Sequence, residues 1–158
     1  MEAIKMADYV HEIRKLVGHR PIILNTAAGI LVNENGEVLL NERVDTHNWS
    51  LPGGYLEYGE TYAQACVREY EEDSGVKVAI KARIDIFDVG DVHYPNGDVT
   101  QTISGLFLVE QVGGQLLQSK TDETLSLAYF PFNELPPLLN QQTADMLAAA
   151  DKFMNARK

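Results

Sequence analysis

Residues 54–76 read GYLEYGETYAQACVREYEEDSGV, and this stretch decides how the chain is interpreted. It sets six acidic side chains against a single basic one, Arg68. Glu69, Glu72 and Asp73 stand at positions i, i+3 and i+4, so a helix would place their carboxylates on one face. Such like charges repel one another, and Mg²⁺ or Mn²⁺ is a natural partner for clustered oxygen ligands. A solvated acidic face is the alternative, and composition alone leaves both interpretations open.

Local signals predict that this helix covers Tyr62 to Asp73. Thr61 and Gln64 have the spacing of a capping box, and Gly75 stands where a left-handed residue would end the helix. Residues 51–60 contain a Pro-Gly-Gly cluster and are predicted to be a loop. The apolar positions recur with the helical period and predict a core-facing stripe: Ala63, Cys66, Val67 and Tyr70.

The same stretch resembles the Nudix box, a pattern of Gly, Glu, Arg-Glu, Glu-Glu and Gly at fixed spacings. The matching positions here are Gly54, Glu60, Arg68, Glu69, Glu72, Asp73, Gly75 and Val76. Residues 49–54 also resemble the usual lead-in to the box. Two positions depart from the pattern, because Asp73 replaces the last Glu and Tyr70 replaces an aliphatic residue. A pattern over this many positions is far more specific than a lone glycine motif.

The resemblance implies a divalent-metal-dependent hydrolase that cleaves the pyrophosphate bond of a nucleoside diphosphate linked to another group, with Mg²⁺ or Mn²⁺ as cofactor. Nucleoside triphosphates, ADP-ribose, nucleotide sugars and dinucleoside polyphosphates remain open as substrates. A nucleotide joined to a sugar or to a second nucleotide is preferred, because the hairpin at residues 93–98 would wall an elongated cleft. The alternative is a non-catalytic nucleotide-binding or regulatory Nudix-like domain, and Asp73 is the one feature that favours it.

By the same resemblance, Glu69, Glu72 and Asp73 are expected to hold the metal, and the Gly53 backbone carbonyl is a further candidate ligand. Glu69 and Glu72 are thereby also expected to be catalytic. Because an aspartate is one methylene shorter than a glutamate, Asp73 is expected to bind directly or through a water, with consequences for metal affinity or preference.

The general base is sought outside the box, at Asp122 or Glu123, and Glu123 is preferred because the family often has a Glu just before this strand. A solvated acidic turn is the alternative there. Arg43 resembles an arginine that contacts phosphates in relatives, with a surface arginine as the alternative. Arg68 and Glu60 are expected to brace the helix and the loop, and so to orient the ligands.

Composition describes an ordinary globular chain of 158 residues, with 45% hydrophobic residues, and one domain over residues 1–158 is expected. The net charge of −10 argues against broad nucleic-acid binding. No apolar run suits a membrane span, and no export signal is recognised. Cys66 is the single cysteine, which favours a reducing, cytoplasmic location. Core packing is the expected role of its thiol.

An α/β fold follows from the order of predicted elements, and the resemblance implies an α/β/α sandwich, a mixed sheet with helices on both sides. The predicted helices are Glu2 to Val17, within residues 1–18, the box helix, and Asn140 to Asn155, within residues 140–156. Strands are predicted in residues 22–32, 37–41, 76–92 (as two strands or one bent strand), 99–109 and 125–130, with a turn at Gly113-Gly114. The N-terminal helix is a candidate surface for a homodimer, and a nucleotide is the expected small-molecule partner.

Overall fold

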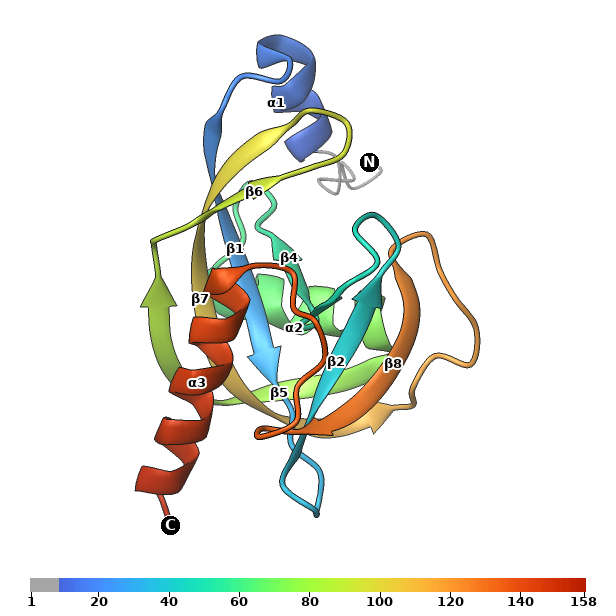
Figure 1. The fold of residues 1–158 in the computed structure, drawn as a ribbon, viewed down its shortest axis with the longest axis vertical. Coiled ribbons are helices and arrows are strands. Elements are labelled where there is room, and N and C mark those ends of the chain that lie inside the picture. Colours follow the sequence, from blue (N-terminus) through green and yellow to red (C-terminus); the bar gives the residue numbers. More distant parts are fainter. Residues whose placement is uncertain (1–8) are drawn as a thin grey trace.

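The structure, a computed structural model, describes residues 9–158 (Figure 1). In chain order its elements are α1 (Tyr9–Val17), β1 (Ile22–Ile30), β2 (Glu37–Arg43), β3 (Trp49–Ser50), β4 (Gly53–Tyr55), α2 (Tyr62–Ser74), β5 (Val76–Phe87), β6 (Asp91–His93), β7 (Val99–Gly114), β8 (Thr124–Pro131) and α3 (Gln141–Ala156). Among these residues, no helix has both the length and the apolar character that crossing a membrane requires.

The strands form one mixed sheet and one smaller antiparallel sheet. In the mixed sheet the order is β4-β1-β7-β5, and β6 pairs with β7 beside this path. Strands β1 and β7 run parallel, and the other pairs are antiparallel. The smaller sheet has the order β3-β2-β8. Parallel pairing of β1 with β7 requires a long crossover, and the box helix α2 lies within that crossover.

Two apolar cores lie on opposite sides of the strands, because successive side chains of a strand point to opposite faces. Ala27 and Phe107 belong to the core that includes α2. Their neighbours Ala28 and Leu106 belong to the core that includes α3. Figure 1 shows α2 and α3 separated by the strands. The predicted α/β class, a mixed sheet with helices on both sides, is therefore confirmed.

Local chemistry fixes α2 as the sequence predicts. The Gln64 backbone N–H donates to the Thr61 hydroxyl at 3.1 Å, and the Thr61 N–H donates to the Gln64 side chain at 3.0 Å, which completes the capping box. Gly75 ends the helix with a φ of 82°. Cys66 and Tyr70 are fully buried, while Ala63 and Val67 pack on the same core at its edge.

Several predicted boundaries need correction. Residues 51–60, predicted to be a loop, contain β4, because Gly53 has no side chain and so lets this segment pair closely with Ala27 and Ala28 of β1. Gly113-Gly114, predicted to be a turn, continues β7 opposite Lys77 and Val76 across an irregular register. These pairings join segments far apart in sequence, so local turn signals do not reveal them.

The remaining elements match their predictions within a few residues. Strands predicted in residues 37–41, 99–109 and 125–130 lie within β2, β7 and β8. The segment 76–92 forms two strands, β5 and the start of β6, which was one of the two predicted arrangements. The predicted N-terminal helix is present as α1, and its part before Tyr9 lies outside the described residues. The C-terminal helix is α3.

Replacing Gly75 by Ala should destabilise the protein more than replacing Gly36 by Ala. Both glycines have positive φ, 82° and 76°, and strain there costs an L-residue about 1–2 kcal/mol. A Cβ on Gly75 would also overlap the backbone oxygen of Gln115, whereas a Cβ on Gly36 meets nothing within 4 Å. This overlap should add about 1–3 kcal/mol. Urea unfolding of the two variants measures the difference, and equal losses would contradict the packing at the end of α2.

Candidate active site

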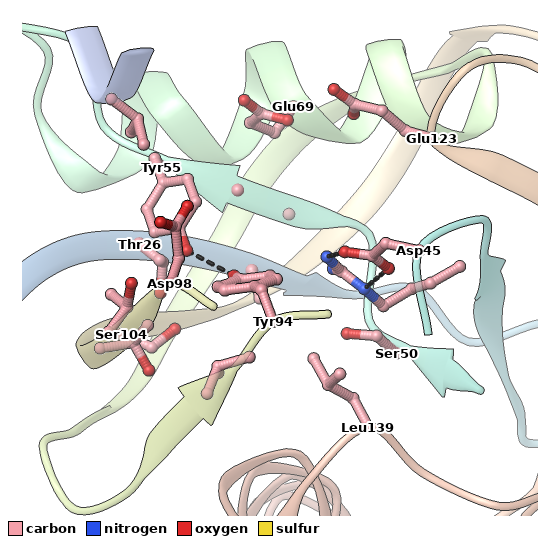
Figure 2. Close-up of a pocket in the computed structure, with 18 of the residues that line it drawn as sticks. Thr26, Asp45, Ser50, Tyr55, Glu69, Tyr94, Asp98, Ser104, Glu123 and Leu139 are labelled. Carbon is pink, nitrogen blue, oxygen red and sulfur yellow. Dashed lines mark hydrogen bonds and ion pairs between the residues drawn. The ribbon is translucent and has the colours of Figure 1, made fainter. Parts of the chain in front are cut away.

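Three carboxylates converge on one side of a large cavity. Glu69 and Asp73 lie one turn apart on α2, and Glu123 comes from the turn before β8. One oxygen from each residue lies within 4.8 Å of the others. Figure 2 shows Glu69 and Glu123 on the same side of the cavity, above Asp45 and Tyr94. We call Glu69, Asp73 and Glu123 the acidic cluster.

Burial makes the charged forms of Glu69 and Asp73 energetically unfavourable. Burial raises the pKa of Glu69 to about 7, even though Arg68 acts to lower it. Burial raises the pKa of Asp73 well above its ordinary value, and the charges of Glu69 and Glu123 add to this rise. Charged oxygens so close together and so poorly hydrated suit a divalent cation, and carboxylates are the ligands that Mg²⁺ and Mn²⁺ prefer.

Backbone contacts fix Asp73, the residue that departs from the box pattern. Its Oδ2 accepts a hydrogen bond from the Gly53 N–H at 3.0 Å, and only 4% of the residue is exposed. The hydroxyl of Thr124 donates to the Asp73 backbone oxygen at 3.1 Å, so the residue next to Glu123 is tied to the end of α2. The sequence suggested the Gly53 carbonyl as a metal ligand. In the structure, the backbone N–H of Gly53 is the group that contacts Asp73.

Arg68 joins the helix to the loop that precedes it. Its guanidinium donates to both Glu60 oxygens at 2.7 Å and to the Tyr55 backbone oxygen at 3.1 Å. It also donates to Glu69 at 2.8 Å. These are the contacts expected of a bracing residue, since they orient Glu69 toward the cavity.

Close approach of the loop to α2 depends on Gly54. A Cβ on this residue would lie 2.5 Å from the Glu69 carboxyl carbon. In the structure Gly54 makes room for the carboxylate of Glu69.

Glu72, Asp122 and Arg43 lie around the acidic cluster without belonging to it. The side chain of Glu72 is 53% exposed and lies 3.4 Å from Arg68. Asp122 lines the cavity together with Glu123. Arg43 also lines the cavity, and its Nε and Nη2 donate to Asp45 at 2.9 and 2.7 Å. The sequence therefore identified most of the charged groups here, but missed Asp45, the partner of Arg43.

The cavity has a volume of about 870 Å³ and extends well beyond the acidic cluster. Tyr55 of β4 and Tyr94 of the β6–β7 turn join through their hydroxyls within it (Figure 2). Thr26 and Ser104 line the part next to this pair, where β1 and β7 run in register. Sequence reasoning proposed the hairpin at residues 93–98, which contains Tyr94, as a wall of the cleft, but it missed Tyr55 and the hydroxyl-bearing strand residues.

Known proteins resemble this chain in sequence and in fold. A family model described as the NUDIX domain matches residues 24–150. An ADP-ribose pyrophosphatase of Methanocaldococcus jannaschii is 31% identical over 112 residues, which cover 70% of this chain and 63% of that protein. An 8-oxo-dGTP diphosphatase of Escherichia coli is 31% identical over 120 residues, covering 72% and 88%. The crystal structure of an ADP-ribose pyrophosphatase from Streptococcus suis superimposes with a TM-score of 0.68 at 24% identity, covering 83% of this chain and 91% of that one.

Glu69→Gln should stabilise the metal-free protein at pH 8 and have little effect near pH 4. The pKa of Glu69 is about 7 in the folded protein against an ordinary 4.5, so the folded state holds the proton more tightly. The contribution of Glu69 to the free energy of unfolding is therefore most favourable below pH 4.5 and falls by about 3 kcal/mol as the pH rises through 7. Urea unfolding in EDTA at the two pH values tests this. A variant whose stability relative to wild type does not change with pH would contradict the electrostatics of the cluster.

Proposed function

The chain belongs to the NUDIX family, and from this premise we propose that it hydrolyses the diphosphate bond of a nucleotide linked to another group, with Mg²⁺ or Mn²⁺ as cofactor. The observation that carries the proposal is the convergence of Glu69, Asp73 and Glu123 within 4.8 Å at one side of a cavity of about 870 Å³. A cavity of this size accommodates a small organic ligand. The acidic cluster alone would repel its phosphates, so a cation must lie between them.

The acidic cluster fits such a cation by its chemistry. All three side chains offer carboxylate oxygens, and burial raises the pKa of Glu69 and of Asp73, so a nearby cation would favour their charged forms. When bound there, the cation would neutralise charge on the diphosphate oxygens. Glu72 stands three residues after Glu69 and directly before Asp73, and it is half exposed, so it is placed to assist a cation that arrives with the substrate.

Glu123 is the proposed general base. It is the exposed member of the acidic cluster and lies on a turn, so a water at the cavity surface can reach it. The water oxygen would bond to phosphorus, the bridging oxygen would leave with the second phosphate group, and Glu123 would accept the proton from the water. Asp122 lines the same cavity and is the second candidate for this role.

Arg43 is the proposed phosphate contact. Its planar guanidinium already binds the Asp45 carboxylate through two parallel hydrogen bonds, which is the geometry that also suits a phosphate. A substrate phosphate would compete with Asp45 for these donors. Asp45 thereby holds Arg43 extended into the cavity before the substrate enters.

The shape of the cavity favours a nucleotide joined to a sugar. The cavity continues from the acidic cluster past Tyr55 and Tyr94 to the hydroxyls of Thr26 and Ser104. Two of the relatives are named for ADP-ribose, which has a sugar beyond its diphosphate. Another is named for 8-oxo-dGTP, so both compounds belong in the first substrate panel.

A nucleotide-binding domain without catalysis is the second candidate, and one observation favours it. Asp73 replaces a Glu of the box, and one of its oxygens is already bonded to the Gly53 N–H. Asp73→Glu tests the point directly. A several-fold gain in turnover would mark the shorter side chain as a handicap, while a loss would mark the site as adapted to it.

Glu123→Gln and Asp73→Asn should each lower kcat for the cleaved substrate by about 10²- to 10⁴-fold, because they remove a proton acceptor or a cation ligand. The measurement is phosphate-ester product formation from ADP-ribose, 8-oxo-dGTP and a nucleotide sugar, with Mg²⁺, Mn²⁺ or EDTA. Glu71→Gln is the matched control, since it removes one exposed charge from the same helix outside the cluster. Turnover that persists in EDTA, or that survives both cluster substitutions, would refute the proposal.

A further inference from the structure

Helix α1 lies outside residues 24–150, which match the family model, yet it forms part of the cavity wall. Val10, His11, Glu12, Arg14 and Lys15 all line the cavity. None of the α1 residues is fully buried, so apolar packing alone does not hold the helix in place. Its position therefore depends on polar contacts.

Arg14 supplies most of these contacts. Its Nη1 donates to the backbone oxygens of Gly18 at 3.0 Å and Arg20 at 2.6 Å, which closes the end of α1. Its Nη2 donates to the Val99 backbone oxygen at 2.9 Å and to the Thr100 hydroxyl at 3.0 Å. Only 10% of the side chain is exposed. A single guanidinium thus joins α1 to the first residues of β7.

The contacts of Arg14 continue into the cavity. The Nε of Arg14 lies 3.7 Å from the carboxylate of Asp98, and the backbone oxygen of Asp98 accepts a hydrogen bond from the Tyr94 N–H at 2.9 Å. The Tyr55 hydroxyl pairs with that of Tyr94. A series of polar contacts therefore leads from Arg14 through Asp98 of the β6–β7 turn to the two tyrosines, whose hydroxyls are joined in Figure 2.

Two further contacts hold α1 across the opening of the cavity. At its start, the Tyr9 N–H donates to the carboxylate of Glu57 at 3.3 Å. Just past its end, His19 lies 2.7 Å from Asp98, the last residue of the turn that carries Tyr94. Figure 1 shows α1 beside the turn between β6 and β7. The helix is therefore attached both to the loop before α2 and to this turn.

We propose that Arg14 is a positioning residue of the substrate site, which fixes Tyr55 and Tyr94 as a wall for the hydroxyl-bearing sugar beyond the cleaved diphosphate. This inference rests on the proposed function. Thr26 and Ser104 offer hydroxyl groups beside the same wall, and a sugar presents both a face to pack on a tyrosine ring and hydroxyls to bond. Arg14 acts through these residues and is not itself a catalytic residue.

Arg14→Ala should weaken binding of α,β-methylene ADP-ribose, in which carbon replaces the bridging oxygen, by about 10- to 100-fold in the presence of Mn²⁺. Displacement of a binding wall by about 1 Å is enough for such a loss. The Kd for Mn²⁺ alone should stay within about twofold of wild type, since Arg14 does not contact the acidic cluster. For a cleaved ADP-ribose, KM should rise by the same factor as Kd.

Arg20→Ala is the matched control, because it removes the same charge three residues beyond α1 but keeps the backbone oxygen that accepts from Arg14. The proposal is overturned if Arg14→Ala binds the analogue as tightly as Arg20→Ala, even with a lower Tm. If the proposed function itself were wrong, the wild-type protein would show no metal-dependent turnover, which is a different result from unchanged binding in Arg14→Ala.

Discussion

The guanidinium of Arg68 is the interaction on which the site depends. It lies between the loop of residues 55–60 and the face of α2, and donates to Glu60, to Glu69 and to the Tyr55 backbone oxygen. This one cation offsets repulsion among acids that would otherwise push the loop away from the helix. It also places two parts of the cavity at once, since Glu69 belongs to the acidic cluster and Tyr55 to the wall that it forms with Tyr94. Loss of Arg68 would leave Glu60 and Glu69 partly buried without a counter-charge, which is among the more costly changes a protein can undergo.

Burial and mutual repulsion of the carboxylates in the acidic cluster lower the stability of the metal-free protein, and a functional role of the cluster explains why they are kept. Asp73 is only 4% exposed, and an apolar residue at this core position would stabilise the folded protein more, because burial strongly disfavours a charged carboxylate. Sites that keep such groups commonly do so for chemistry. Binding a divalent cation would reverse the penalty, because the desolvated carboxylates then have an opposite charge to contact. Metal binding, folding stability and catalysis are thereby expected to depend on the same three side chains.

Sequence reasoning succeeded where the physics is local. The capping box of Thr61 and Gln64, the left-handed Gly75 and the acid spacing on α2 all follow from positions within a few residues of one another. The short strand β4 escaped prediction because it pairs with β1 only between residues 53–55 and 26–28, which are far apart in sequence. This pairing also depends on Gly53 having no side chain. The pairing of Tyr55 with Tyr94 and the contacts of Arg14 with Val99 and Thr100 join residues far apart in sequence. No periodicity or motif encodes such contacts, so the wall formed by α1 could only be seen in three dimensions.

Anomalous X-ray scattering from crystals grown with Mn²⁺ would test the central claim most directly, because it locates the cation without relying on turnover. The account predicts a Mn²⁺ peak in contact with carboxylate oxygens of Glu69, Asp73 and Glu123, at about 2.0–2.3 Å. The same peak should be lost in crystals of Asp73→Asn. A peak bound elsewhere in the chain, or no peak at millimolar Mn²⁺, would contradict the assignment of the acidic cluster as the metal site.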